Sequence, residues 1–325
     1  MWTNNGKKLF LYRLLNKGAT LKTSNNTDVS FSISYSFKIA DYRYLGTRIG
    51  EAETNCYGFA IYCGGNDNTI LPEDYTLQNP LSLTYINGSN TDTGVSKTFQ
   101  YTVQNDNAES ITIKELALCA ISSGNTALIN HKVLPTPITL AVGEQAIITY
   151  TVNTSNIIDG DGWTNNFKLF ANNQFLYLTM QEKYLDTTNA EAYGNVNNFV
   201  NALFATANYP ANMLSTGTSI RYKMGIFVGQ GTNPTTPEDY ILEAPVSLSL
   251  LSSEYSIDEN FNLLISFTMK NNTTETYTIT ETGLCAAPNS FLVLLNRKLL
   301  PTPVVMEPND SYVFTYTINT SNLSE

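Results

Sequence analysis

The sequence has little charge and little basic character. Charged residues make up 14% of its 325 residues, against roughly 25% in an average soluble domain. The formal net charge is −10 and the pI is about 4.7, whereas nucleic-acid-binding proteins gather lysine and arginine on one face. We therefore expect a polar surface built from Asn, Thr, Ser and Tyr, and no nucleic-acid partner.

Histidine and cysteine are also scarce. The single histidine, His131, rules out a metal site built from several histidines. No nucleophile motif such as G-x-S-x-G lies near it, so a catalytic role for His131 is not indicated. Four cysteines do not make a disulfide framework, and the spacing of Cys56 and Cys63 matches no zinc motif. We expect no metal, no cofactor and no enzymatic activity.

Long apolar runs are absent from the sequence. No stretch approaches the roughly 18 apolar residues that a membrane-spanning helix needs. The basic, partly apolar start at residues 1–13 is broken by Arg13 and has no small-residue cleavage site after it. We expect neither a signal peptide nor a membrane partner.

What the sequence does contain is a block written twice. Glu115-Leu-Ala-Leu-Cys119 returns as Glu281-Thr-Gly-Leu-Cys285, and Leu134-Pro-Thr-Pro137 returns as Leu300-Pro-Thr-Pro303. Glu281 follows Glu115 at the same distance along the chain as Leu300 follows Leu134. This constant offset indicates a tandem duplication.

Within each copy the apolar residues recur at every second position, as from Val29 to Phe37. A period of two with β-branched and aromatic residues is typical of strands that bury one face. The copies contain seven or more such segments, separated by Asn, Gly, Asp and Pro turns, which predicts an all-β fold of two tandem antiparallel β-sandwiches, Ig-like or jelly-roll-like. We expect the first repeat at 1–156, a linker at 157–162 and the second repeat at 163–325.

Two local features qualify this pattern. Near-helical spacing over 188–206 allows a short helix in the second copy. Four prolines, which donate no backbone hydrogen bond, should lie at a sheet edge or a crossing between strands rather than in a central strand. They are Pro135, Pro137, Pro301 and Pro303.

Structural roles are expected for most of the repeated polar residues. Cys119 and Cys285 each follow a leucine and should act as small buried apolar side chains. Glu115 and its counterpart Glu281 fall on an apolar face, where an unpaired carboxylate is costly. A bulge or a nearby cation would resolve this, and the matching lysines, Lys132 and Lys298, are the candidate ion-pair partners.

Two acidic motifs invite a functional interpretation. Pro72-Glu-Asp-Tyr75 returns as Pro237-Glu-Asp-Tyr240, and two carboxylates suggest a glycosidase. Adjacent side chains diverge, however, which favours a turn whose aspartate accepts from nearby amides. Asp159 and Asp161 lie in a fragment of a calcium-loop pattern that lacks its closing glutamate, so a linker turn is favoured there and calcium binding stays open.

Together these motifs resemble β-sandwich modules from structural proteins of tailed bacteriophages. The resemblance is carried by Pro-Glu-Asp-Tyr-x-Leu-x-x-Pro, Ile-Thr-Ile-x-Glu-x-x-Leu, Leu-Leu-x-Arg-Lys-Leu-Leu-Pro and the last Tyr-Thr-Ile. It covers 57–156 and 222–322, and the first copy departs from it at Ala117 and His131, where the second has glycine and arginine. Such modules occur in head-decoration, head-fibre, collar and tail-associated proteins.

The resemblance implies a non-enzymatic component of a virion, without an active site. Its partners would be further copies of itself and other virion proteins, on the outside of the particle. An alternative follows from the 20 tyrosines and the many amides, since rings stack on sugars while amides bind their hydroxyls. This alternative is a carbohydrate-binding or adhesion module of a phage fibre or cell surface, with surface glycans as partners.

Overall fold

The computed structural model describes residues 2–14, 19–31, 40–92, 96–153, 181–185, 191–195, 223–287 and 293–319. The chain divides into two compact units, whose main spans are Met1–Asn156 and Thr179–Asn322. The expected linker, with Asp159 and Asp161, lies outside the described residues. Antiparallel sheets make up most of the described chain, so the expectation of an all-β fold is confirmed.

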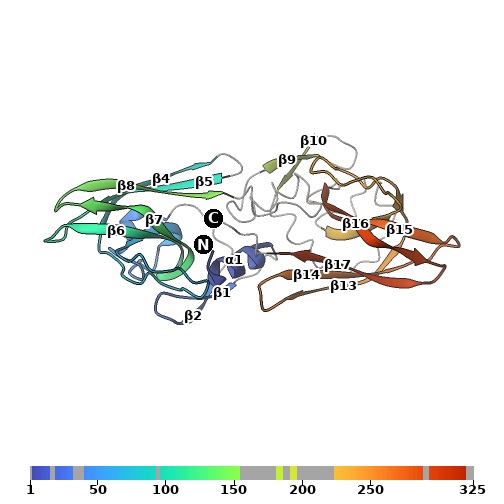
Figure 1. Ribbon diagram of the computed structural model, residues 1–325, viewed down its shortest axis with the longest axis horizontal. Helices are drawn as coiled ribbons and strands as arrows, with labels where there is room; N and C mark the ends of the chain where they lie inside the picture. The colour runs from blue at the N-terminus through green and yellow to red at the C-terminus, as the bar shows by residue number, and fades with distance from the viewer. Residues whose placement is uncertain are drawn as a thin grey trace. The chain divides into compact units, whose positions relative to one another are not determined.

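Among its described residues, the first unit contains one α-helix, one short 3-10 helix and eight strands. They are α1 (Asn4–Leu14), β1 (Ala19–Lys22), β2 (Asp28–Phe31), η1 (Tyr42–Tyr44), β3 (Tyr57–Gly64), β4 (Thr84–Asp92), β5 (Ser96–Gln104), β6 (Ile111–Ser122), β7 (Asn125–Leu140) and β8 (Gln145–Asn153). Two of its sheets have the strand orders β3-β6-β7 and β4-β5-β8, and β1 pairs with β2. Figure 1 shows the two larger sheets as layers.

The second unit repeats this strand order. Its strands are β9 (Gln181–Leu185), β10 (Glu191–Asn195), β11 (Lys223–Gly229), β12 (Pro245–Val246), β13 (Ser249–Ile257), β14 (Leu263–Lys270), β15 (Tyr277–Ala287), β16 (Val293–Met306) and β17 (Ser311–Ile318). One sheet runs β12-β11-β15-β16 and the other β13-β14-β17, while β9 pairs with β10. The strand β10 replaces the start of the helix that the spacing over 188–206 allowed, and the end of that span lies outside the described residues.

Burial patterns follow from what covers each strand. Leu263–Lys270 alternates between buried and half-buried positions, as expected for a strand with one face in a core. Residues 58–64 of β3, by contrast, are buried at every position. Both faces of that sheet are covered in the first unit, because α1 and β1 contact β7 while aromatic side chains meet between the two layers.

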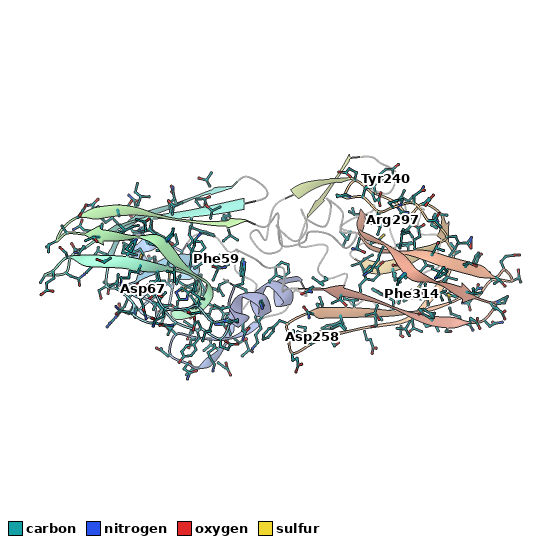
Figure 2. All side chains as sticks on the ribbon, in the orientation of Figure 1. Phe59, Asp67, Tyr240, Asp258, Arg297 and Phe314 are labelled. Carbon is teal, nitrogen blue, oxygen red and sulfur yellow. The ribbon has the colours of Figure 1, made fainter. Side chains whose placement is uncertain are left out.

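The interlayer core of the first unit is aromatic. The Phe59 and Phe99 rings lie 5.7 Å apart between the sheets, and Figure 2 marks Phe59 there. Tyr85 packs edge-on against Tyr62 and Tyr101, at centroid distances of 5.7 and 5.5 Å. The buried hydroxyl of Tyr85 donates to the Ile61 carbonyl at 2.9 Å, so this ring fills the core and its polar end is hydrogen-bonded as well.

The helix α1 was not expected from the sequence. Its residues Leu9 and Phe10 are each 1% exposed, and the Asn5 side chain both donates to and accepts from the backbone of Lys22 on β1. Just before the helix, Thr3 donates its amide to the Ile129 carbonyl of β7. The N-terminal segment therefore covers one part of the outer edge of β7.

Each unit has irregular pairing at the same two places. The β6-β7 register shifts between Ile113 and Glu115 and between Leu118 and Cys119. The β15-β16 register shifts between Ile279 and Glu281 and between Leu284 and Cys285. Every position in the second set is separated from its counterpart by the offset of the sequence repeat, so the bulges recur with that repeat.

The bulges also decide where the prolines lie. The strand β7 runs through Leu134-Pro-Thr-Pro137 without a break. Residues 134–137 fall in the gap of the register between Val133 and Ile138, and Pro135 and Pro137 are both exposed. Pro301 and Pro303 occupy the matching gap in β16. No ladder hydrogen bond is needed at these positions.

Candidate functional site

The first unit buries an ionisable cluster, called here the histidine cluster, formed by Asp74, Glu115 and His131. The Nε2 of His131 lies 2.6 Å from Oε2 of Glu115, and its Nδ1 lies 3.6 Å from Oδ2 of Asp74. The side chains of His131 and Glu115 are 1% and 2% exposed, and that of Asp74 is 16% exposed. The imidazole is therefore enclosed between two acidic side chains.

The second unit has a corresponding arginine cluster, formed by Arg297, Glu281, Asp239 and Glu243. Arg297 donates from Nε to Glu281 at 2.7 Å, from Nη1 to Asp239 at 3.0 Å and from Nη2 to Glu243 at 3.4 Å. Burial would lower the pKa of Arg297, but its hydrogen bonds to Glu281 and Asp239 outweigh burial and raise that pKa. Figure 2 marks Arg297 on its sheet and Phe314 in the facing layer.

These contacts correct the ion pairs expected with Lys132 and Lys298. Both lysines are exposed, and the cation beside each glutamate is the residue just before the lysine. The ladder pairs Lys132 with Leu116 and His131 with Ala117, which puts His131 on the face of β6 that Glu115 also occupies. A shift of one residue along a strand reverses the face, so the neighbouring lysine points away.

Each glutamate lies against glycines on the strand beside it or just after it. A Cβ atom on Gly64 would overlap the carboxylate of Glu115, and one on Gly229 or Gly231 would overlap that of Glu281. In the second unit, the carboxylate of Glu281 accepts from the amides of Gly231 at 3.1 Å and Ala244 at 2.9 Å. Glu281 thus holds the connection that follows β11 in place, and the glycines leave space for its carboxylate.

The two clusters differ by a second exchange besides histidine for arginine. Gln78 of the first unit accepts from the Asn68 side chain at 2.7 Å. Glu243, at the position of the second copy that corresponds to Gln78, accepts from the Asn233 side chain at 2.6 Å. Asn233 corresponds to Asn68 by the same offset. The unit with the permanent cation has the extra carboxylate, and the unit with histidine has a neutral amide in its place.

The Pro-Glu-Asp-Tyr motifs form turns, as the sequence favoured. Asp74 accepts from the amide of Leu71 at 2.9 Å, and Asp239 accepts from that of Thr236 at 3.0 Å. Asp74 also faces the buried imidazole of His131, and Asp239 faces the buried guanidinium of Arg297. The aspartate of each motif therefore connects its turn to the cluster.

The N-terminal segment closes the histidine cluster from another side. Trp2 bridges to Asn130, the residue before His131, and the amide of Asn4 donates to the Pro72 carbonyl at 2.7 Å. Residues 2–4 thereby join β7 to the turn that contains Asp74. This contact could not be predicted from the sequence, because nothing in residues 1–13 indicates a partner so far along the chain.

All four cysteines are buried and reduced. Cys119 and Cys285 are 0% and 3% exposed, at matching positions of β6 and β15. Burial raises the pKa of Cys56 to about 11 and that of Cys63 to about 12. These thiols are therefore protonated at neutral pH and are poor nucleophiles.

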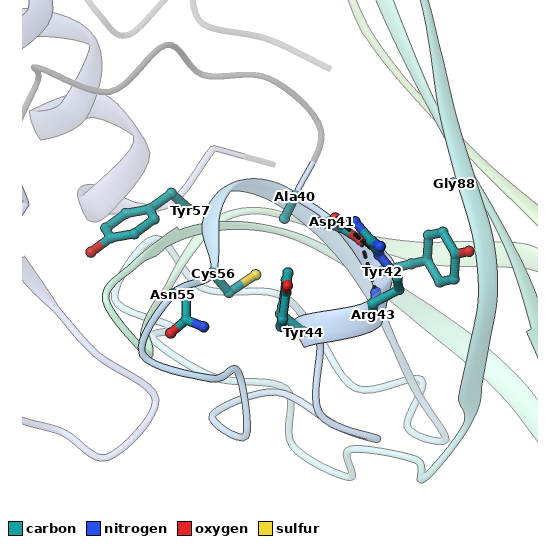
Figure 3. A pocket seen from close by; sticks show the side chains of 9 residues that line it. All are labelled: Ala40, Asp41, Tyr42, Arg43, Tyr44, Asn55, Cys56, Tyr57 and Gly88. Carbon is teal, nitrogen blue, oxygen red and sulfur yellow. Dashed lines mark hydrogen bonds and ion pairs between the residues drawn. The ribbon is translucent and has the colours of Figure 1, made fainter.

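The first unit also has a tyrosine-lined pocket with a volume of about 530 Å³. Its walls come from three separate segments, residues 40–44, residues 55–57 and one position of β4 (Figure 3). The lining residues are Ala40, Asp41, Tyr42, Arg43, Tyr44, Asn55, Cys56, Tyr57 and Gly88. Sequence analysis identified none of them as a site, although the abundance of tyrosine suggested that a binding face exists.

Charges at the pocket are internally compensated. The guanidinium of Arg43 donates from Nε to Asp41 at 3.0 Å and from Nη2 at 2.5 Å. It also lies 5.7 Å from the ring centre of Tyr44, within the range of a cation-π contact. Figure 3 shows this ion pair on one wall, with the Cys56 thiol and the Asn55 amide on another.

Comparisons with protein-family models, curated proteins and solved structures find no match. Over the described residues, no helix has the length and apolar character to cross a membrane. The same part of the chain contains no group of three or more His, Cys, Asp or Glu side chains arranged to hold a metal ion.

Proposed function

We propose that the chain is a non-enzymatic structural protein of a tailed-bacteriophage virion, composed of two tandem β-sandwich repeats on the outside of the particle. The observation that carries the proposal is the nature of what the two units share. The shared positions are buried glutamates with their cations, paired bulges and edge prolines. A repeated scaffold of this kind supports a mechanical role more than a repeated reaction.

A shared corner supports the sandwich part of the proposal. The side-chain amide of Asn105 donates to the carbonyls of Glu109 and Leu140 at 2.9 and 3.0 Å. Asn271, the corresponding residue of the second copy, donates to those of Glu275 and Met306 at 2.7 and 3.0 Å. Each asparagine joins the end of one sheet to a strand of the other.

The strands β8 and β17 offer a surface for assembly. Each is the last strand in its sheet among the described strands, and each exposes an apolar side chain at the same position of the repeat. Ile147 is 67% exposed, and Val313 is 52% exposed. A sheet edge with exposed β-branched residues is a surface on which another chain can pair, in keeping with self-association or contact with other virion proteins.

Particle composition tests this proposal. Virions are purified from the source on a density gradient, and labelled peptides of this chain are quantified against those of the major capsid protein. We expect many copies per particle, retained through salt washes. Complete absence from purified particles would refute a virion role.

A carbohydrate-binding or adhesion module is the second candidate. The tyrosine-lined pocket is the observation that favours it, because three tyrosines and an asparagine line one open cavity. A glycan array probed with the purified full chain tests this candidate separately from particle composition.

A further inference from the structure

We propose that the tyrosine-lined pocket of the first unit binds a neutral saccharide. This inference rests on the second candidate function and is independent of the virion role. The pocket lies in residues 40–57 and at Gly88, mostly ahead of the region in which the two copies match in sequence. Its residues are therefore not explained by the scaffold that the copies share.

The side chains that line the pocket have the chemistry of sugar recognition. Tyr42, Tyr44 and Tyr57 each provide a ring and a hydroxyl, and Asn55 adds an amide that both donates and accepts. The apolar face of a sugar ring packs on aromatic rings, while its hydroxyls need donors and acceptors around the edge. Tyr42, Tyr44 and Tyr57 are half-buried, so part of each remains accessible.

Charge compensation decides in favour of a neutral ligand. The carboxylate of Asp41 and the guanidinium of Arg43 satisfy each other, and Asp41 also accepts from the Arg43 amide at 3.1 Å. An acidic sugar would have to compete with Asp41 for Arg43, and a cation would have to compete with Arg43 for Asp41. Cys56 is 1% exposed and protonated, so the pocket offers no thiolate to a metal.

The walls of the pocket are held in place by the core. The amide of Ala40 donates to the Phe59 carbonyl at 2.8 Å, and the buried Tyr101 hydroxyl donates to the Ala40 carbonyl at 2.8 Å. The amide of Glu53 donates to the Tyr44 carbonyl at 2.9 Å, which joins the two tyrosine-bearing segments. A pocket fixed in this way loses little freedom when a ligand enters.

Gly88 keeps the β4 wall open. It pairs directly with Tyr101 on β5, and directly paired residues share a face of the sheet. Because Tyr101 is buried, a side chain at position 88 would project to the same inner side, where the pocket lies. The substitution Gly88→Val should therefore fill the space a sugar would occupy.

The test is a titration of the full chain with defined sugars, in which binding is measured by calorimetry and by saturation-transfer NMR. The probes are glucose, galactose, N-acetylglucosamine, maltose, lactose and chitobiose, with glucuronic acid and sialic acid as acidic comparisons. We expect at least one neutral probe to bind. Tyr42→Ala should weaken that binding by about tenfold or more, whereas Tyr42→Phe, which keeps the ring, should change it by less than about threefold.

A matched control comes from Tyr312, an exposed tyrosine of the second unit that is 44% exposed. Tyr312→Ala should leave the affinity unchanged, and Gly88→Val should abolish binding while circular dichroism stays that of the native chain. Binding of none of the neutral probes, binding of acidic sugars alone, or binding that survives both Tyr42→Ala and Gly88→Val would overturn the proposal. Each of these outcomes leaves the particle-composition test unaffected.

Discussion

The side chains of Glu115 and His131 are in hydrogen-bond contact, although the two residues are not directly opposite in the ladder. Glu115 faces Val133 and His131 faces Ala117, yet Oε2 and Nε2 lie 2.6 Å apart. Glu281 and Arg297 repeat this diagonal contact at 2.7 Å. The acid is thus constant between the units and the cation varies, which makes each unit a control for the other.

Removal of the Glu115 side chain should destabilise the first unit far more than removal of the side chain of Lys132, the residue after His131. Glu115→Ala removes the buried carboxylate that contacts His131 and should cost about 3 kcal/mol of unfolding free energy. Lys132→Ala changes an exposed side chain and should stay within about 0.5 kcal/mol. Hydrogen exchange of peptides from β6 and β7, read by mass spectrometry, measures both. Equal losses in the two variants would contradict the assignment of His131 as the partner.

The clusters differ at two positions, and the effects of these two differences on stability should be coupled. Gln78→Glu alone adds a carboxylate near Glu115 and should destabilise the first unit, because histidine is not a permanent cation. Adding His131→Arg should recover stability, with a coupling energy of about 0.5 kcal/mol or more. The reverse cycle, Glu243→Gln with Arg297→His, is the matched control in the second unit. Additive effects in both cycles would show that the exchange has no electrostatic basis.

Two buried tyrosines should respond differently to loss of the hydroxyl. The Tyr62 hydroxyl is buried and has no hydrogen-bond partner among the described residues, so Tyr62→Phe should be neutral or stabilising. The Tyr101 hydroxyl donates to the carbonyls of Ala40 and Phe59, and Tyr101→Phe should cost about 1 to 2 kcal/mol. Urea unfolding measures the change in unfolding free energy of each variant. A larger loss of stability for Tyr62→Phe than for Tyr101→Phe would contradict the contacts described above.

The thiols should resist alkylation and make the fold sensitive to alkali. Burial raises the pKa of Cys56 from 9.0 to about 11 and that of Cys63 from 9.0 to about 12. Between pH 9 and these values the unfolded chain loses thiol protons that the folded chain keeps, so stability is full below pH 9 and falls as pH rises.

Iodoacetamide at pH 8 should therefore leave the native chain unmodified and modify all four cysteines in urea. Intact-mass spectrometry counts the adducts, and urea unfolding at pH 8 and pH 10 measures the change in stability. Rapid modification of Cys56 in the native chain would show that the base of the pocket is open to solvent. The Cys119 thiol, which is 0% exposed, serves as the internal reference.

The sequence by itself determined the features that depend on local order and periodicity. The constant offset between matching motifs identified the repeat, and the period of two with β-branched and aromatic residues indicated the all-β fold. The isolated glutamates at 115 and 281 indicated a bulge or a cation on a neighbouring strand. A register shift lies beside each glutamate, and a basic side chain of the paired strand contacts it. The aspartates of Pro-Glu-Asp-Tyr were correctly assigned to turns, because their amide partners lie close by in the sequence.

Tertiary structure decided everything that depends on which face a side chain takes or on contacts between distant segments. The cation beside Glu115 was misassigned by one residue, because a bulge sets the register and one residue reverses the face of a strand. The helix α1 is held by β1 and β7, and the pocket combines residues 40–44 with residues 55–57 and Gly88. Neither can be read from a local pattern, since the residues that stabilise or complete them lie far along the chain.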